Sequence, residues 1–469
     1  MLFNSLEFLI FLIPVYVGYL VLKRKQQNHL LLVASYVFYA AWDYRFLALI
    51  VGSTVVDYLC GAAIDDATTP QKRKMFLGVS LVANLGSLAF FKYFNFFTES
   101  LAELISATGI PFHTGSLDII LPIGISFYTF QTMSYTIDIY RGKLAPVKNP
   151  LDFALYVSFF PQLIAGPIER ASRFLPQLTS DRKVDADAVH QDIWLILLGL
   201  YQKIFIADNL AEIVNPLFAD STTSGALVLL AIYGFAFQIY CDFAGYSNIA
   251  RGLARLMGFD LMVNFNAPYF ASSISDFWKR WHISLSSWLK DYLYIPLGGN
   301  RRGTLFTVRN LIITMLLGGL WHGAAGHFIV WGAFHGLLLA TYHVIKKHSL
   351  VRIPENNRIA EFVCIAATFH LVCIGWLFFR AESTAQALTM LANLTHFKVA
   401  AGMGLSGFTS LAVLVLPLVV LDYFSFRQQT PVIIFNSPVW LRSAVCSAFL
   451  LSIIMAGKFG ADEFIYFQF

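Results

Sequence analysis

The chain has 469 residues, of which 57% are hydrophobic and only 13% are charged, with a net charge of +5. About a quarter of the residues of a soluble protein are charged, so this composition excludes a protein whose surface is mostly exposed to water. Apolar runs of about 20 residues, enough for a helix to cross a bilayer, recur along the sequence. The chain is therefore predicted to be all-α and polytopic, with one membrane-embedded domain over residues 1–469.

About twelve membrane spans are predicted from these apolar runs. They lie near residues 6–22, 30–42, 46–64, 76–97, 118–139, 190–207, 225–246, 310–325, 328–345, 360–379, 408–425 and 439–457. The first run has no basic residue before it and is followed by the cluster Lys23, Arg24 and Lys25. This order is the reverse of a secretory signal, so we expect the run to be retained as a span.

The basic residues are distributed unevenly over the predicted loops. Residues 98–117 and 208–224 contain no Lys or Arg, whereas most basic residues lie in the alternate loops. This is the positive-inside pattern of cytoplasmic loops, and it explains the basic excess without a nucleic-acid partner. It predicts that both termini lie on the extracytoplasmic side.

The five cysteines lie in apolar surroundings and form no CxxC pair. They are Cys60, Cys241, Cys364, Cys373 and Cys446. Their spacing supports neither a disulfide framework nor a zinc site, so we predict packing thiols and no bound metal. No HExxH, GxSxG, Walker or dinucleotide-binding motif occurs, which leaves metal hydrolysis, soluble esterase chemistry and ATP-driven transport without support.

Two longer segments interrupt the regular alternation of predicted spans and short loops. In residues 140–189, Pro and Gly break an apolar run, and such backbone is tolerated at membrane depth only inside protein or beside a wet cavity, so we predict a re-entrant or interfacial element. Residues 264–309 indicate an amphipathic helix followed by the Gly-rich turn 298–303. One arc of that helix is aromatic, with Lys279 and Arg280 opposite, which is typical of a helix lying in the membrane interface.

His322 lies in the most informative stretch, residues 318–326, where glycine and alanine surround it. Small residues allow a neighbouring backbone or a substrate to approach closely. An ionisable residue within a span usually marks a site, and histidine is suited to proton transfer near neutral pH. Alternatively, His322 could form a hydrogen bond between helices. His282, at the edge of the aromatic arc, and Asp242 favour the catalytic interpretation, because several polar residues then occur in one apolar chain.

Six ordered motifs resemble the membrane-bound O-acyltransferase family, in particular its bacterial branch with the membrane components for alginate and peptidoglycan O-acetylation. They are SYTIDIYR at 134–141, FFPQLIAGPI at 159–168, QIYCDFAGYS at 238–247, DFWKRWHISL at 276–285, DYLYIPLGG at 291–299 and LWHG at 320–323. They define a motif-bearing core of about 130–345, and the rhythm of spans extends the resemblance over the chain.

The resemblance implies a ring of tilted helices around a thinned membrane centre, with re-entrant elements and a central funnel. His322 corresponds to the family's histidine in that funnel, and His282 to a second one. The resemblance also implies a bacterial inner-membrane location, an acyl donor on the cytoplasmic side, an acceptor reached from the other face, and no bound cofactor.

On this basis we expect acetyl-CoA to be the acyl donor. The candidate substrate-binding residues combine a tryptophan beside His322, polar residues of the motifs and the turn, and basic residues that could meet phosphates; they are Trp321, Lys279, Arg280, Asp291, Asn300, Arg301 and Arg302. The positive-inside pattern explains these charges equally well. The acetyl group would pass to an extracytoplasmic acetyltransferase partner resembling the SGNH hydrolases, and then to a polysaccharide, while membrane lipid surrounds the chain.

The stretch 458–469 is predicted to be extracytoplasmic, yet 464–469 is almost wholly apolar and would not remain in water. Ten extended residues reach about 33 Å, so this tail could fold back and bring Tyr466 toward His322. It resembles the C-terminal motif of a small partner protein in teichoic acid D-alanylation, whose tyrosine is implicated as an acyl carrier. A membrane-anchoring aromatic end would show the same composition.

The hypothesis is therefore that His322 acts as a general base toward an acceptor hydroxyl, which could be that of Tyr466. The sequence leaves two alternatives open. A non-enzymatic exporter of glycan or lipid could use intramembrane His and Asp as a relay. An acyltransferase could also act on a lipid or a protein instead of alginate, peptidoglycan or another exopolysaccharide.

Overall fold

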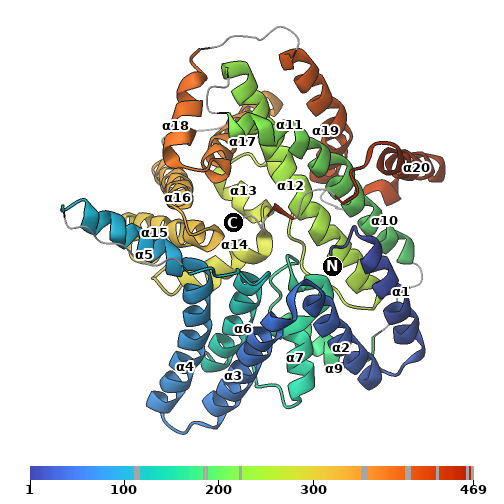
Figure 1. Ribbon diagram of the computed structural model, residues 1–469, viewed down its shortest axis with the longest axis vertical. Coiled ribbons are helices and arrows are strands. Elements are labelled where there is room, and N and C mark those ends of the chain that lie inside the picture. The colour runs from blue at the N-terminus through green and yellow to red at the C-terminus, as the bar shows by residue number, and fades with distance from the viewer. Residues whose placement is uncertain are drawn as a thin grey trace. The chain divides into compact units, whose positions relative to one another are not determined.

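The computed structural model describes residues 1–109, 117–182, 185, 188–220, 224–349, 357–396, 403–428, 433–460 and 464–465. Regular structure within these ranges is helical and includes no strand, which confirms the all-α prediction (Figure 1). The chain forms two compact units. The N-terminal unit comprises Met1–Val189 and Leu253–Met262, and the C-terminal unit comprises His190–Gly252 and Val263–Phe469.

The N-terminal unit is built from mostly apolar helices. They are α1 (Leu6–Val21), α2 (Arg24–Asp43), η1 (Tyr44–Phe46), α3 (Leu47–Asp66), α4 (Pro70–Leu88), η2 (Ala89–Tyr93), α5 (Phe94–Ser106), α6 (Ile125–Tyr140), α7 (Pro150–Ser158), α8 (Phe160–Leu163) and α9 (Ala171–Thr179). Polar side chains cap α1, α4 and α7. The Ser5 side chain caps α1 by accepting from the Phe8 N–H. Helices α3, α4 and α6 pack together, and the buried Asp57 accepts a hydrogen bond from Asn84 at 2.7 Å.

Residues 140–189 contain the three short helices α7, α8 and α9. The breaks between them lie inside the N-terminal unit, where Phe159, Phe160 and Ala165 are fully buried. The Tyr156 carbonyl accepts a hydrogen bond from the Gln162 side chain at 2.8 Å, which satisfies one backbone group at a break. Interrupted backbone buried in protein agrees with the expected re-entrant or interfacial element.

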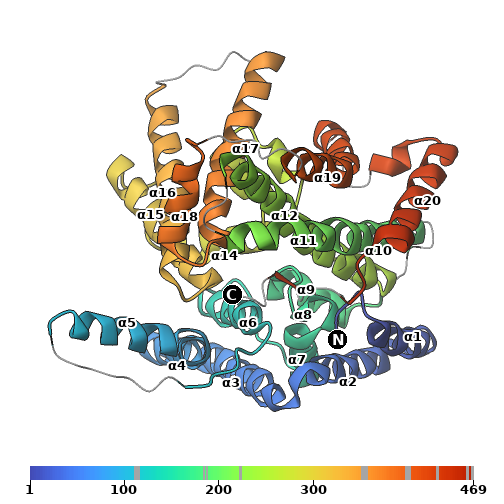
Figure 2. The same ribbon diagram turned by 45° about the horizontal axis from the view of Figure 1, so that its top comes forward.

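The C-terminal unit contains the remaining helices. They are α10 (Val189–Leu200), η3 (Tyr201–Ala207), α11 (Asp208–Ala219), α12 (Gly225–Leu256), η4 (Pro268–Phe270), α13 (Ile274–Arg280), α14 (Ile283–Leu289), η5 (Lys290–Tyr294), α15 (Thr304–His322), α16 (Gly326–Lys347), α17 (Arg358–Arg380), α18 (Thr384–Asn393), α19 (Met403–Gln428), η6 (Ile433–Asn436) and α20 (Val439–Ala456). Helices α15 and α16 lie side by side as a hairpin, and α17 packs on α16 (Figure 2).

In the described part of the chain, nine helical stretches are long and apolar enough to cross a membrane. This confirms a multi-pass membrane protein. The predicted spans 30–42 and 46–64 form one stretch, Arg24–Asp66, while α1 and α6 have 16 residues each and fall short of the other spans. Apolar runs alone do not reveal these joins and shortenings, so the orientation of the termini stays a prediction.

The prediction of a single amphipathic helix within 264–309 is wrong, because the helix is interrupted at His282, between α13 and α14. The Asn264 carbonyl accepts the Ile283 N–H at 2.9 Å, and the Asn264 side chain accepts the Ser284 N–H at 3.2 Å. These bonds satisfy the start of α14 and allow the turn. The aromatic arc also packs against protein, because Phe277, Trp281 and Trp288 are buried within the C-terminal unit.

Candidate active site

His322 and His282 are brought together by one aromatic ring, that of Trp321. The His322 ring lies edge-on to Trp321, with centroids 5.0 Å apart, and the His282 ring lies 5.9 Å from the same indole. Both histidines are buried, with exposed fractions of 4% and 0%. The two histidines predicted from the sequence therefore belong to one site in the C-terminal unit.

His322 is fixed by the hairpin of α15 and α16. It is the last residue of α15, and its ring also contacts Trp331 at 5.0 Å and Phe379 at 5.2 Å. A Cβ atom at Gly319 would collide with the Phe328 carbonyl, so only glycine permits the two helix backbones to approach this closely. The small residues around His322 therefore allow α16 to pack close to α15, and such a close neighbour is expected from the sequence.

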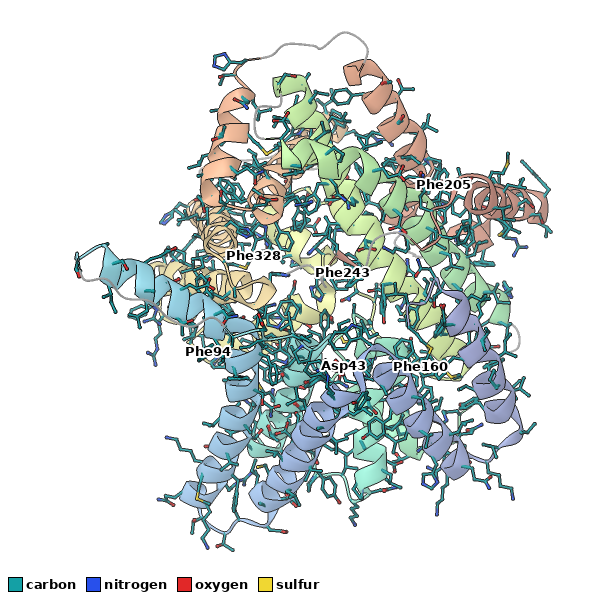
Figure 3. All side chains as sticks on the ribbon, viewed as in Figure 1. Asp43, Phe94, Phe160, Phe205, Phe243 and Phe328 are labelled. Carbon is teal, nitrogen blue, oxygen red and sulfur yellow. The ribbon has the colours of Figure 1, made fainter. Side chains whose placement is uncertain are left out.

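His282 occupies an uncommon backbone conformation. Its φ and ψ of 42° and 54° lie in the left-handed region, which a non-glycine residue adopts only when the surrounding structure enforces it. Its ring packs edge-on against Phe243, a residue of α12 that is labelled in Figure 3, at 4.6 Å. Burial lowers the pKa of His282 to about 3, so the imidazole is neutral at physiological pH.

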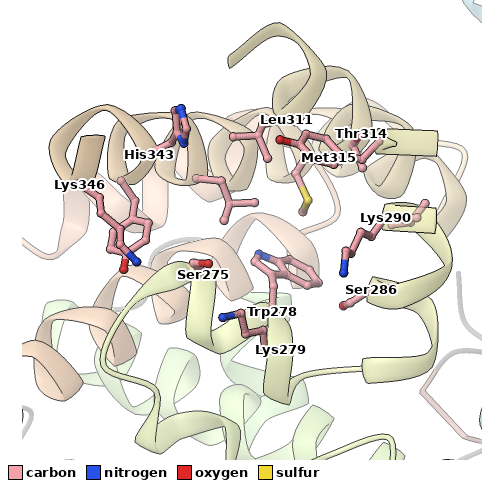
Figure 4. A pocket seen from close by; sticks show the side chains of 14 residues that line it. Ser275, Trp278, Lys279, Ser286, Lys290, Leu311, Thr314, Met315, His343 and Lys346 are labelled. Carbon is pink, nitrogen blue, oxygen red and sulfur yellow. The ribbon is translucent and has the colours of Figure 1, made fainter. Parts of the chain in front are cut away.

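A cavity of about 400 Å³ opens beside the two histidines' helices and is lined by three lysines (Figure 4). We call it the basic pocket; its lining residues are Ser275, Trp278, Lys279, Ser286, Leu289, Lys290, Tyr294, Leu311, Thr314, Met315, Leu339, Tyr342, His343 and Lys346. The lysines come from α13, η5 and α16. Its volume and mixture of apolar and polar walls are typical of small-molecule sites.

A line of aromatic rings connects the basic pocket to His322. Trp278 lines the pocket, and its ring lies 5.8 Å from that of Trp331. Trp331 in turn contacts His322. The buried His335, which no sequence pattern joins to His322, packs against both tryptophans, at 5.3 Å and 4.9 Å. The pocket and His322 are therefore separated by the thickness of these rings.

The structure assigns only part of the predicted substrate-binding set to the pocket. Lys279 lines it, and Trp321 lies between the histidines. Arg280 instead forms an ion pair with Asp276 at 2.9 Å.

Asp291, Asn300, Arg301 and Arg302 are not among the lining residues, and the last three are exposed in the turn before α15. Tyr466 lies outside the described residues.

Lys290, His343 and Lys346 are pocket residues that the sequence patterns do not single out. The amphipathic pattern places Lys290 on the polar side of a surface helix, and membrane topology alone accounts for Lys346. A signal is present in α16, since Tyr342 and His343 lie four and three residues before Lys346 and are therefore neighbours of it on the helix surface. Only the tertiary structure shows that this face of α16 and η5 line the same pocket.

Comparisons with known proteins cover the whole of this site. Residues 145–379 match the model of MBOAT, the membrane-bound O-acyltransferase family. The chain is 42% identical to the probable alginate O-acetylase AlgI of Pseudomonas aeruginosa, over 96% of this chain and 85% of the relative.

It is 36% identical to the peptidoglycan O-acetyltransferase of Helicobacter pylori, over 84% of this chain and 80% of the relative. It is 32% identical to the teichoic acid D-alanyltransferase of Bacillus subtilis, over 55% of this chain and 69% of the relative.

Proposed function

The chain belongs to the membrane-bound O-acyltransferase family and is an O-acyltransferase, and from this premise we propose that it transfers acetyl from cytoplasmic acetyl-CoA for O-acetylation of a polysaccharide outside the bacterial inner membrane. The observation that carries the proposal is the line of rings from the basic pocket through Trp278 and Trp331 to His322. It joins a cationic binding site to a group capable of proton transfer. The acceptor class rests on the two polysaccharide O-acetyltransferases among the relatives.

The donor's phosphates would meet Lys279, Lys290 and Lys346. Lysine ammonium groups bind phosphate as point charges, and three of them line this cavity from separate elements. The lysines occur in segments that the positive-inside pattern assigns to the cytoplasm. The apolar wall at Trp278 suits the uncharged arm of the donor, whose thioester would then be directed toward His322.

His322 would act as general base. It takes the proton of the acceptor hydroxyl as that oxygen attacks the thioester carbonyl, the carbon–sulfur bond breaks, and the thiol of CoA leaves with a proton. Neutral His282 keeps one ring N–H and one ring acceptor, so it can stabilise charge that develops nearby without carrying charge itself.

Tyr466 is proposed as the hydroxyl that first receives the acetyl group. The described residues just before it, Phe464 and Ile465, are buried, and the Phe464 ring lies 5.6 Å from Phe243. Phe243 also contacts His282. A tyrosine hydroxyl has an ordinary pKa near 10, so acylation at neutral pH needs a base. The acetyl group would then pass to a separate extracytoplasmic transferase of the SGNH-hydrolase type and on to the polysaccharide.

The test uses purified full-length protein and acetyl-CoA labelled in the acetyl group, with CoA thiol release and labelled protein as readouts. We expect His322→Ala to lower turnover by about 10²–10⁴-fold. His370→Ala, at an exposed histidine of α17, is the matched control and should keep full turnover. Unchanged turnover in folded His322→Ala protein would refute the base assignment.

Family membership decides against a non-enzymatic exporter. The remaining alternative, a lipid or protein acceptor, is tested by where the label goes. Mass spectrometry of secreted and cell-wall glycans from a strain lacking the protein should show loss of acetyl ester on one polysaccharide. An unchanged glycan together with a newly unacetylated lipid or protein would overturn the proposed acceptor.

A further inference from the structure

The segment between α10 and α11 is π-helical. Residues Tyr201–Ala207 form η3, and π-helical turns of this kind are frequent at functional sites. The carbonyl of Ile204, within η3, accepts a hydrogen bond from the backbone N–H of Lys458 at 3.1 Å. The extra residue of a π-turn thus presents a backbone acceptor to a segment more than 250 residues later in the sequence.

Further contacts hold the chain just after α20. The Asn209 side chain donates to the Ala456 carbonyl at 2.8 Å, and the Lys458 ammonium lies 2.8 Å from the Glu212 carboxylate. Residues 456–458 therefore make both backbone and side-chain contacts with η3 and α11. The ion pair alone is solvent-exposed and contributes little, so the backbone bonds determine the path of this segment.

A buried group of charges lies next to this path. The Lys203 ammonium is 2.7 Å from Oδ1 of Asp208 and 2.9 Å from Oδ1 of Asp242. All three side chains are at least nine-tenths buried. Lys203 contacts Oδ1 of Asp242, and a carboxylate has a second oxygen, Oδ2, that can accept from a further hydrogen-bond donor.

That donor is the backbone of the C-terminal segment. The Ile465 N–H donates to Oδ2 of Asp242 at 2.7 Å. Beside it, the Phe464 ring lies 5.6 Å from Phe243 and 5.4 Å from Tyr246, both on α12. Phe464 and Ile465 are 2% and 3% exposed, so the segment is part of the packed interior of the C-terminal unit.

Glycines place Lys203 against Asp242. A Cβ at Gly199 would lie 2.5 Å from the Gly245 carbonyl, and a Cβ at Gly245 would lie 2.7 Å from the Gly199 carbonyl. Helices α10 and α12 therefore meet backbone to backbone just before η3 begins. This close approach allows Asp242 of α12 to reach the Lys203 ammonium, which Asp208 contacts from the start of α11.

We propose that η3 and the Lys203–Asp208–Asp242 group form a docking site for the chain's own residues 456–460 and 464–465, and that Asp242 is a positioning residue for Phe464 and Ile465. The docking site directs the end of the chain toward the aromatic wall that includes Phe243 and His282. A role of this docking site in catalysis rests on the proposed function, because Tyr466 directly follows the docked residues in the sequence. The docking itself requires no acyl donor.

The experiment measures docking directly. Full-length protein carrying Ile465→Cys is treated with a water-soluble maleimide in detergent, and the five native cysteines are corrected for with protein that lacks this substitution. We expect slow labelling, because position 465 is buried. Adding Asp242→Leu removes the acceptor and should raise the labelling rate about tenfold or more. Asp242→Asn keeps an acceptor oxygen and should label nearly as slowly as the parent.

Two further variants separate docking from general loosening. Phe464→Ala leaves the charges intact and should also speed labelling. Asp422→Asn alters an aspartate of α19 that accepts a hydrogen bond from Tyr240 instead, and should leave the rate unchanged. Slow labelling in folded Asp242→Leu and Phe464→Ala proteins overturns the proposal.

A second readout addresses positioning. Acetyl turnover in Asp242→Leu should fall about tenfold or more, with the KM for acetyl-CoA nearly unchanged, and Asp242→Asn should recover most of it. If Asp242→Leu speeds labelling but the parent protein shows no acetyl transfer, the proposed function is disproved and the docking proposal stands. Normal turnover with a released segment would disprove the positioning role alone.

Discussion

Trp331 and His322 meet edge to face, with ring centroids 5.0 Å apart and planes inclined by 84°. Trp331 also contacts Trp278, a lining residue of the basic pocket, at 5.8 Å. One indole therefore contacts both the proposed base and a wall residue of the proposed donor site.

Replacing Trp331 should harm turnover more than donor binding. Trp331→Ala leaves a cavity beside His322, which costs about 3–5 kcal/mol of the free energy of unfolding and frees the imidazole to move. We expect kcat to fall about tenfold or more with a smaller change in KM. Trp331→Phe fills most of the space and should retain more activity. Steady-state kinetics with acetyl-CoA measures both variants, and equal losses would contradict the support role.

The lysines of the basic pocket should control donor affinity. Lys290→Ala and Lys346→Ala should each raise the KM for acetyl-CoA about two- to fivefold, because a partly solvated charge pair contributes about 0.2–1 kcal/mol. The effect should weaken at high salt. Arg301→Ala and Arg302→Ala are matched controls, since both arginines lie outside the pocket lining. A larger KM change in the arginine variants would contradict this prediction and would place donor binding at the turn before α15.

Gly319 should be intolerant of any side chain. Gly319→Ala places a methyl group against the Phe328 carbonyl, so α15 and α16 must separate and shift His322. Overpacking of this kind costs about 1–3 kcal/mol. Thermal unfolding in detergent and turnover should both decline. Gly326→Ala is the control, because a Cβ there meets no atom within 4 Å; equal effects at both glycines would argue against the clash.

His282 should make stability depend on pH. Burial lowers its pKa to about 3 in the folded chain, against about 6.5 when unfolded. Between these values only the unfolded chain binds the proton, so the free energy of unfolding falls as pH drops from about 6.5 toward 3, by at most about 1.4 kcal/mol per pH unit.

His282→Gln removes this contribution. Its stability relative to the parent protein should therefore improve steadily as pH falls below about 6.5. Denaturant unfolding at several pH values measures the difference. A difference that is constant with pH would show that His282 titrates normally in the folded chain.

Tyr466 should be required for export of the acetyl group and not for donor binding. Tyr466→Phe removes only the hydroxyl, so acetyl-CoA binding should persist while acetyl-labelled protein disappears. Binding calorimetry and mass spectrometry of the intact protein provide the two readouts. Full export by Tyr466→Phe would assign the tail to membrane anchoring.

The sequence alone determined the class of protein and the identity of the central residue. Membrane character follows from composition and from apolar runs, which are local properties that neighbouring elements do not alter. His322 is identifiable because an ionisable side chain among small residues is conspicuous in an apolar span. The lengths of the helices are predicted less accurately, because an apolar run does not reveal how far helical structure continues beyond it, as in the stretch Arg24–Asp66.

Tertiary structure decided which charges share a site and how the tail runs. Lys290 and Lys346 are distant in sequence and line one cavity only because η5 and α16 both border it, while Arg301 and Arg302 remain at the surface. The break at His282 depends on Asn264, and the path of Ile465 on Asp242. Each is a long-range hydrogen bond between polar groups removed from water, and no local pattern encodes such a partner.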